Sequence, residues 1–181
     1  FLPFLPMLPI QILLNNLLYD FSQLTIPMDN VDADYVKRPQ RLGTNYIRKF
    51  MLAFGPISSI FDFLTFFVMI VIFKANEPLF QTAWFIESLF TQTLVIFAIR
   101  TRMVPFWKSK PSKALILNIM VVLAVAMALP FTFFRKYFKF TALPPMFLLV
   151  LGIFIVVYLG LVELVKLWFY RKEKNSSSSV K

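Results

Sequence analysis

The sequence predicts an all-α membrane protein, a polytopic helix bundle with about five transmembrane helices. Hydrophobic residues make up 59% of the chain and charged residues only 15%. Soluble domains are usually about 45–50% apolar. The mean hydropathy is +0.72. The apolar residues gather in five runs of roughly 20 residues, which is the length a helix needs to cross the hydrocarbon core.

The five predicted spans are separated by short polar segments that contain most of the Lys and Arg residues. They cover residues 6–26, 50–73, 79–99, 114–134 and 146–170. Residues 1–170 therefore form one predicted membrane domain. Residues 171–181 are charged and then serine-rich, and we predict a disordered cytoplasmic tail there.

Proline and glycine mark the starts and breaks of these spans. Pro9 fits the first turn of the first helix, where a missing amide donor has no partner to lose. Gly55-Pro56 breaks the second span mildly, and Pro130 interrupts the end of the fourth. A very short link, residues 74–78, leads into the third span, which we therefore expect to lie antiparallel to the second.

The basic residues predict the orientation of the chain in the membrane. If the spans alternate, residues 27–49, 100–113 and 166–181 lie on one side and hold 15 of the 19 Lys and Arg residues. Cytoplasmic loops carry the excess of Lys and Arg. We therefore predict an N-terminus outside and a C-terminus in the cytoplasm.

Composition also excludes several kinds of site and partner. The chain has no Cys and no His, so it contains no disulfide, no Cys/His zinc site and no His-based catalysis. The net charge is +10, but the basic residues lie in short loops between apolar runs. That pattern is typical of membrane topology, so the expected partner is the lipid bilayer and not nucleic acid. Because the chain begins at Phe1 inside an apolar run, we expect it to be a segment of a longer polypeptide.

One stretch of the first span is too polar for contact with lipid. It contains Gln11, Asn15, Asn16 and Asp20 among aliphatic residues. A carboxylate at bilayer depth costs roughly 2.5–3.5 kcal/mol on insertion scales, so these groups should face protein or a hydrated path. Asn16 and Asp20 are four residues apart and share one helix face. This face is the candidate functional centre.

Three further acids fall within the predicted spans. Asp62 lies near the middle of the second span and Glu87 near the middle of the third. Glu163 lies near the cytoplasmic end of the fifth, and a local ion pair with Lys166, three residues on, explains it. A cation between Asp20, Asp62 and Glu87 would offset the cost of placing three acids in the membrane.

Two explanations of Asp62 and Glu87 remain open at this point. Either carboxyl group could be neutral and hydrogen-bonded to a neighbour, with Ser58 one turn before Asp62 and Thr91 and Gln92 one turn after Glu87. Either could instead bind an ion. All the candidate ligands are hard oxygens, which suit Mg²⁺, Ca²⁺, protons or alkali ions better than soft transition metals.

Several blocks of this sequence resemble transmembrane helices of P-type cation-transporting ATPases. The block Leu8–Asp20 resembles the sixth helix, Phe54–Asp62 the seventh and Phe80–Leu94 the eighth. Pro27–Asp32, followed by Lys37-Arg38-Pro39, resembles the cytoplasmic loop after the sixth helix. These blocks are most similar to the bacterial magnesium-importing branch, and the resemblance is dense over residues 4–106 and thin afterwards.

The resemblance implies an intramembrane Mg²⁺ site in an ATP-driven transporter of the plasma membrane. Asn16 and Asp20 match the family's ligand pair, and Glu87 matches an acid that is a ligand in some branches. Asp62 and Asn15 are further candidates.

The resemblance also gives the following loop a role. Asp29, Asp32, Lys37 and Arg38 are expected to couple the helices to the phosphorylation domain. Tyr19 stands where calcium pumps carry Thr, which counts against a calcium-type ligand set.

The parts of such a pump that act on ATP are missing from this sequence. It contains no Asp-Lys-Thr-Gly-Thr phosphorylation motif, and its loops are too short for a nucleotide-binding or actuator domain. We therefore expect no ATP hydrolysis by this chain alone, and we expect its partners to be the N-terminal helices and cytoplasmic domains of the same pump. Two alternatives remain open: another hard cation such as Ca²⁺ or H⁺, and a non-catalytic membrane scaffold or subunit.

Overall fold

The computed structural model describes residues 2–30, 32 and 44–178, without the side chains of residues 45, 46 and 172–178. Throughout these ranges the regular structure is helical and no β-strand occurs. Four helical segments are long and apolar enough to cross a membrane: Ile47–Ile72, Glu77–Ile99, Lys113–Phe131 and Pro145–Arg171. The prediction of an all-α polytopic membrane bundle is confirmed.

The described helices follow the order of the predicted spans. They are α1 (Pro9–Gln23), α3 (Thr44–Phe67), α4 (Glu77–Ile99), α5 (Lys113–Ala128), α6 (Arg135–Phe138) and α7 (Pro145–Ser178). A π-helical segment, Val68–Ile72, continues α3, and 3₁₀ turns follow α1 at Ile26–Met28 and α5 at Leu129–Phe131. The helix α7 extends to Ser178, past residue 170, the predicted end of the fifth span, and into the segment predicted to be a disordered tail.

The first helix is shorter than the predicted first span. With 15 residues it is about 22 Å long at 1.5 Å per residue, which is less than the roughly 30 Å of the hydrocarbon core. Pro3 and Pro6 explain the late start, because each removes an amide donor and disfavours helical backbone in the residue before it. Non-helical backbone therefore leads into α1 at Pro9.

Side-chain caps define the starts of α4 and α5. Asn76 Oδ1 accepts a hydrogen bond from the Leu79 amide at 3.1 Å, and Ser112 Oγ accepts one from the Leu115 amide at 3.1 Å. Each cap satisfies one of the amides that has no partner within its helix. Before α4, Lys74 has a φ of 45°, which turns the chain back within the short link predicted from the sequence.

The helix α4 is the centre of the bundle. It packs against α1, α3, α5 and α7, while α3 also packs on α7 and α1 on α5. Its side chains Phe80, Phe85 and Leu89 are fully buried, and so are several of its polar side chains. A helix that is covered on every side by protein can carry polar groups that lipid would not tolerate. This explains why α4 holds Glu87 within the membrane.

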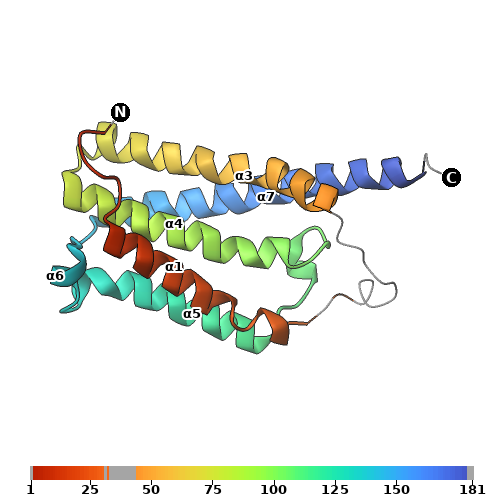
Figure 1. The fold of residues 1–181 in the computed structure, drawn as a ribbon, viewed down its shortest axis with the longest axis horizontal. Helices are drawn as coiled ribbons and strands as arrows, with labels where there is room; N and C mark the ends of the chain where they lie inside the picture. Colours follow the sequence, from red (N-terminus) through yellow and green to blue (C-terminus); the bar gives the residue numbers. More distant parts are fainter. Residues whose placement is uncertain (1, 31, 33–43, 179–181) are drawn as a thin grey trace.

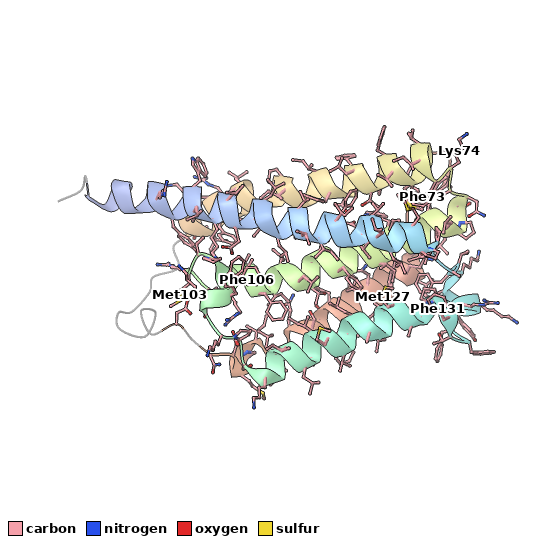
Figure 2. All side chains as sticks on the ribbon, turned by 180° about the vertical axis from the view of Figure 1, so that it is seen from behind. Phe73, Lys74, Met103, Phe106, Met127 and Phe131 are labelled. Carbon is pink, nitrogen blue, oxygen red and sulfur yellow. The ribbon has the colours of Figure 1, made fainter. Side chains whose placement is uncertain are left out.

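The connections lie at two opposite ends of the bundle. The end of α1, the start of α3, the α4–α5 connection and the end of α7 share one end (Figure 1). Lys74 and Phe131 lie at the other end, away from Met103 and Phe106 (Figure 2). This separation agrees with the alternation of loops predicted from the sequence. The assignment of the first end to the cytoplasm remains a prediction from its basic residues.

Candidate functional site

The polar residues of α1 lie on two opposite faces of the helix. Gln11, Asn15 and Ser22 are buried, and they point into the bundle. Asn16 and Asp20 are exposed, on the face that turns away from the other described helices. The exposed aliphatic side chains Ile12, Leu13 and Leu17 surround this pair.

The buried face of α1 uses its amide groups to hold the helix in place. Gln11 Oε1 accepts a hydrogen bond from the Leu8 amide at 3.0 Å, and Gln11 Nε2 donates to the Phe138 carbonyl at 2.7 Å. Asn15 Nδ2 donates to the Phe85 carbonyl at 3.3 Å, and Asn15 Oδ1 accepts from Gln92 Nε2. The oxygen of Asn15 is therefore occupied by Gln92, which makes Asn15 a structural residue between α1 and α4 in this arrangement.

The exposed pair is the part of α1 that remains available to a ligand. Asn16 and Asp20 lie one helical turn apart, so an amide oxygen and a carboxylate face the same direction. In a bilayer, an exposed carboxylate at this depth would meet hydrocarbon unless other protein covered it. The geometry therefore calls for a covering element that is not among the described residues.

Asp62 has a partner that the sequence analysis did not identify. Trp84 Nε1 of α4 donates to Asp62 Oδ1 of α3 at 2.7 Å. Ser58, the expected partner of Asp62, is instead hydrogen-bonded to Tyr158 of α7, with 3.0 Å between the two hydroxyl oxygens. Asp62 and Ser58 thus link α3 to two different helices. The sequence gives no signal for Trp84 as the partner of Asp62, because the contact depends on how α3 packs on α4.

Glu87 is buried without a partner for its charge. Its side chain is 1% exposed, and neither carboxylate oxygen has a hydrogen-bond partner among the described residues. Thr91 donates to the backbone carbonyls of Glu87 and Ser88 at 3.0 and 3.1 Å, and not to the carboxyl group.

The three membrane acids do not converge on one point. Within the described ranges, no group of three or more His, Cys, Asp or Glu side chains is close enough to hold a metal ion. Asp62 of α3 is hydrogen-bonded to Trp84 of α4, three residues before Glu87, whereas Asp20 lies on the exposed face of α1. The hypothesis of a single cation between Asp20, Asp62 and Glu87 is therefore not supported by the arrangement of these helices.

The two loop carboxylates of the predicted coupling segment contact the α4–α5 connection. Asp29 Oδ2 forms an ion pair with Arg100 Nη1 at 2.5 Å, and Asp29 Oδ1 accepts from the Ser112 amide at 2.7 Å. Asp32 accepts hydrogen bonds from the hydroxyl groups of Thr101 and Ser109, both at 2.5 Å. The other two predicted coupling residues, Lys37 and Arg38, lie outside the described residues.

The environment of Asp32 favours its charged form. Partial burial raises the pKa of the Asp32 carboxyl group. The hydrogen bonds from Ser109 and Thr101, and the nearby positive charge of Arg100, lower this pKa by more. The net pKa of Asp32 is below its ordinary value of 3.8, so the carboxylate stabilises the fold at neutral pH.

Glu163 and Lys166 form the expected local ion pair, but it is buried. Lys166 Nζ lies 2.9 Å from Glu163 Oε1, and the Lys166 side chain is 1% exposed. Lys166 Nζ also donates to the Ala98 carbonyl at 2.8 Å, in the last turn of α4. A cation that bonds to a terminal carbonyl stabilises the end of a helix. The ion pair therefore connects α7 to α4 inside the protein, and it is not a local contact at the level of the lipid headgroups.

The comparison with protein families matches nearly the whole chain. Residues 4–168 match the family described as "Cation transporting ATPase, C-terminus". The chain belongs to the cation-transporting P-type ATPases. Its helices are therefore those of the C-terminal membrane domain of such an ATPase, a multi-pass domain that in bacteria lies in the plasma membrane.

The curated proteins that this chain resembles come from bacteria and are named as magnesium-transporting ATPases. The chain is 46% identical over 176 residues to "Magnesium-transporting ATPase, P-type 1" of Escherichia coli (strain K12), and 45% identical over 176 residues to the protein of that name in Salmonella typhimurium (strain 14028s / SGSC 2262). These alignments cover 95% of this chain and 20% of each relative. This chain therefore spans about a fifth of the length of the curated relatives that it matches.

Proposed function

We propose that this chain is the C-terminal membrane part of an ATP-driven Mg²⁺ transporter and that Asn16 and Asp20 form one wall of its ion site. Family membership supports ATP-driven cation transport, and the relatives' names support Mg²⁺ as the transported ion. The observation that carries the proposal is the exposed polar face of α1, on which a carboxylate and an amide oxygen lie one turn apart in an otherwise aliphatic surface.

The chemistry of this pair suits Mg²⁺. Mg²⁺ keeps several of its waters and binds proteins through one or two carboxylates, so a single Asp with a neighbouring amide oxygen provides enough direct contacts for one wall. Asp20 would supply the charge, and the Asn16 oxygen would contact the ion or one of its waters. Glu87 and Asp62 remain candidate ligands on α4 and α3, but they belong to a separate place in the bundle.

The partner that covers this face would be the rest of the same pump. The chain spans about a fifth of its relatives' length, so most of such a pump lies outside it. Helices from that remainder would pack on Leu13 and Leu17 and complete the site opposite Asn16 and Asp20. Residues 27–49 would connect this wall to the domains that bind and hydrolyse ATP.

Growth of a bacterial strain that needs an added Mg²⁺ transporter tests the proposal. The full pump containing Asp20→Ala should reach the membrane at normal levels but fail to support growth in low Mg²⁺. Val156→Ala is the control, because Val156 is 72% exposed on α7, lies away from α1 and has no ligand atom. Normal growth with Asp20→Ala would contradict the proposal.

The choice of ion has its own test. Transport into vesicles should be measured separately with Mg²⁺, Ca²⁺ and a pH gradient, each with the unmodified pump and with Asp20→Ala. We expect only Mg²⁺ transport to depend on Asp20. Transport of Ca²⁺ or H⁺ that is lost in the same variant, without Mg²⁺ transport by the unmodified pump, would assign the site to that ion.

A further inference from the structure

The segment between α5 and α7 has two faces of opposite character. It comprises the 3₁₀ turn Leu129–Phe131 and the short helix α6, Arg135–Phe138. It lies at the same end of the bundle as Lys74 (Figures 1 and 2). One face packs on the bundle, and the other carries large aromatic side chains that are mostly exposed.

The inner face of this segment is fixed to α1 and α4. The Phe138 carbonyl accepts a hydrogen bond from Gln11 Nε2 at 2.7 Å. The Thr141 amide donates to Thr82 Oγ1 at 3.0 Å, and the Phe140 side chain is only 5% exposed. These contacts hold the segment in one orientation, so its outer face is a defined surface of the fold.

We name the outer face the aromatic rim and define it by Phe131, Phe133, Phe134 and Tyr137. These four side chains are 66%, 77%, 56% and 72% exposed. Large apolar groups that are exposed side by side mark contact with another protein or with a membrane. The aromatic rim therefore needs a partner that water does not provide.

The length of α5 places the aromatic rim at the boundary of the membrane. The apolar segment Lys113–Phe131 has 16 residues in α5 and 3 in the 3₁₀ turn. At about 1.5 Å per α-helical residue and about 2.0 Å per 3₁₀ residue, it is about 30 Å long. This equals the thickness of the hydrocarbon core, and aromatic side chains gather at its boundary with the headgroups.

Three cations accompany the rings of the aromatic rim. Arg135, Lys136 and Lys139 are exposed, and within the described residues no ion pair joins them to an acidic side chain. The connections at this end contain only four of the 19 Lys and Arg residues of the chain, and these three are among them. A local cluster of positive charge at the headgroup level is complementary to lipid phosphates.

We propose that the aromatic rim is an interfacial anchor that binds anionic phospholipids of the leaflet at this end of the bundle. The four rings insert at the boundary between headgroups and acyl chains, and Arg135, Lys136 and Lys139 contact the lipid phosphates. The combination of rings and cations favours lipid over a protein partner, because a membrane offers both apolar and anionic contacts at this depth. The anchor does not depend on which ion the pump carries.

Spin-label accessibility in the full pump, reconstituted into vesicles, tests the depth of the aromatic rim. This chain contains no Cys, so Phe133→Cys gives a single labelling site once the rest of the pump is free of Cys. Oxygen concentrates among acyl chains, whereas a polar nickel complex stays in water. The controls are Val156→Cys, at a site 72% exposed on α7, and Lys110→Cys, at an exposed site in the α4–α5 connection.

We expect oxygen to reach the label at position 133 more readily than nickel does, as at position 156, with the reverse at position 110. Greater access for nickel at position 133 would overturn the proposal. A label at position 133 that neither reagent reaches would also overturn it, because another segment or a second copy of the chain would then cover the aromatic rim.

Photocrosslinking from the thiol of Phe133→Cys tests the chemistry of the lipid. A benzophenone on this thiol is activated in vesicles with equal amounts of phosphatidylglycerol and phosphatidylcholine, and mass spectrometry measures the ratio of the two lipids in the adduct. We expect an excess of phosphatidylglycerol, which is lost when Arg135, Lys136 and Lys139 are all replaced by Gln. The matched control, Arg135→Lys with Lys136→Arg and Lys139→Arg, retains the charges and should retain the excess.

Equal crosslinking of the two lipids with the cations in place would contradict the proposed binding of anionic phospholipids. An excess that survives the three Gln substitutions would contradict the role of these cations. Neither readout requires Mg²⁺ transport, so both results stand whether or not Asp20 binds the ion.

Discussion

Asn15 and Asn16 are adjacent in the sequence and face opposite environments in the fold. Asn15 is buried and bonds to Phe85 and Gln92 of α4, whereas Asn16 is exposed beside Asp20. The sequence predicts that α1 has a polar face, but it does not determine which asparagine faces the bundle. That choice depends on where α4 packs, and α4 is more than 50 residues further along the chain.

The buried pair of Glu163 and Lys166 gives a prediction about stability. Lys166→Met should lower the free energy of unfolding by about 3–5 kcal/mol, because it leaves Glu163 buried without a counter-charge and the Ala98 carbonyl without its donor. Thermal unfolding of the detergent-solubilised pump measures the loss. The double variant Glu163→Leu with Lys166→Met should recover much of it. A double variant as unstable as Lys166→Met would contradict this explanation.

The carboxylate of Asp32 gives a prediction about pH. Because its pKa is lowered in the folded state, Asp32 stabilises the protein above its ordinary pKa of 3.8, and the benefit is lost as the pH falls through the lower folded value. The unmodified pump should therefore be more stable than Asp32→Asn at neutral pH, and the difference should shrink below pH 3.8. Unfolding measured from neutral to acidic pH tests this. A difference that is the same at both ends of that range would contradict it.

At the scale of helices, hydropathy predicts all the long elements and overestimates the length of the first helix. The four segments Ile47–Ile72, Glu77–Ile99, Lys113–Phe131 and Pro145–Arg171 match predicted spans because their apolar runs are long and unbroken. The first span is only partly helical because Pro3 and Pro6 disfavour helix before Pro9, and Pro9 occupies the first turn, as its position in the sequence predicts.

Partners between helices were harder to predict than the helices themselves. Ser58 was expected beside Asp62 because it is one turn away, but it bonds to Tyr158, and Trp84 bonds to Asp62. Spacing along one helix determines which side chains share a face. It does not determine which neighbouring helix supplies the partner, and that information comes only from the packing of α3, α4 and α7.

The contact between α1 and α5 gives a prediction at this scale. Asn118→Leu keeps the approximate volume of the side chain but removes the donor to the Phe21 and Ser22 carbonyls, at a cost of about 1–3 kcal/mol. Faster amide hydrogen exchange is expected in the last turn of α1 and in Ile26–Met28. Met120→Leu, on an exposed position of α5, is the control and should leave the exchange unchanged. Unchanged exchange in Asn118→Leu would show that this cap does not hold α1.

At the scale of the whole molecule, the bundle has one surface that lipid alone does not suit. Exposed aliphatic residues elsewhere on the helices can face acyl chains, as on α7, where Val156 is 72% exposed. The exposed face of α1 differs because Asn16 and Asp20 lie among its aliphatic residues. In the proposed pump, helices from outside this chain would cover this face, since the chain spans only a fifth of its relatives' length.

Mg²⁺ uptake by vesicles that contain the full pump is the most direct test of the central claim, that Asn16 and Asp20 form one wall of the ion site. ATP and an Mg²⁺-sensitive dye are sealed inside the vesicles, so that only pumps whose cytoplasmic domains face inward are driven, and the dye reports the uptake of Mg²⁺ added outside. We expect Asp20→Asn, which keeps the shape of the side chain and removes its charge, to abolish uptake, while Val156→Ala on the exposed face of α7 should transport at the normal rate. Normal uptake by Asp20→Asn would contradict the claim that Asp20 belongs to the ion site.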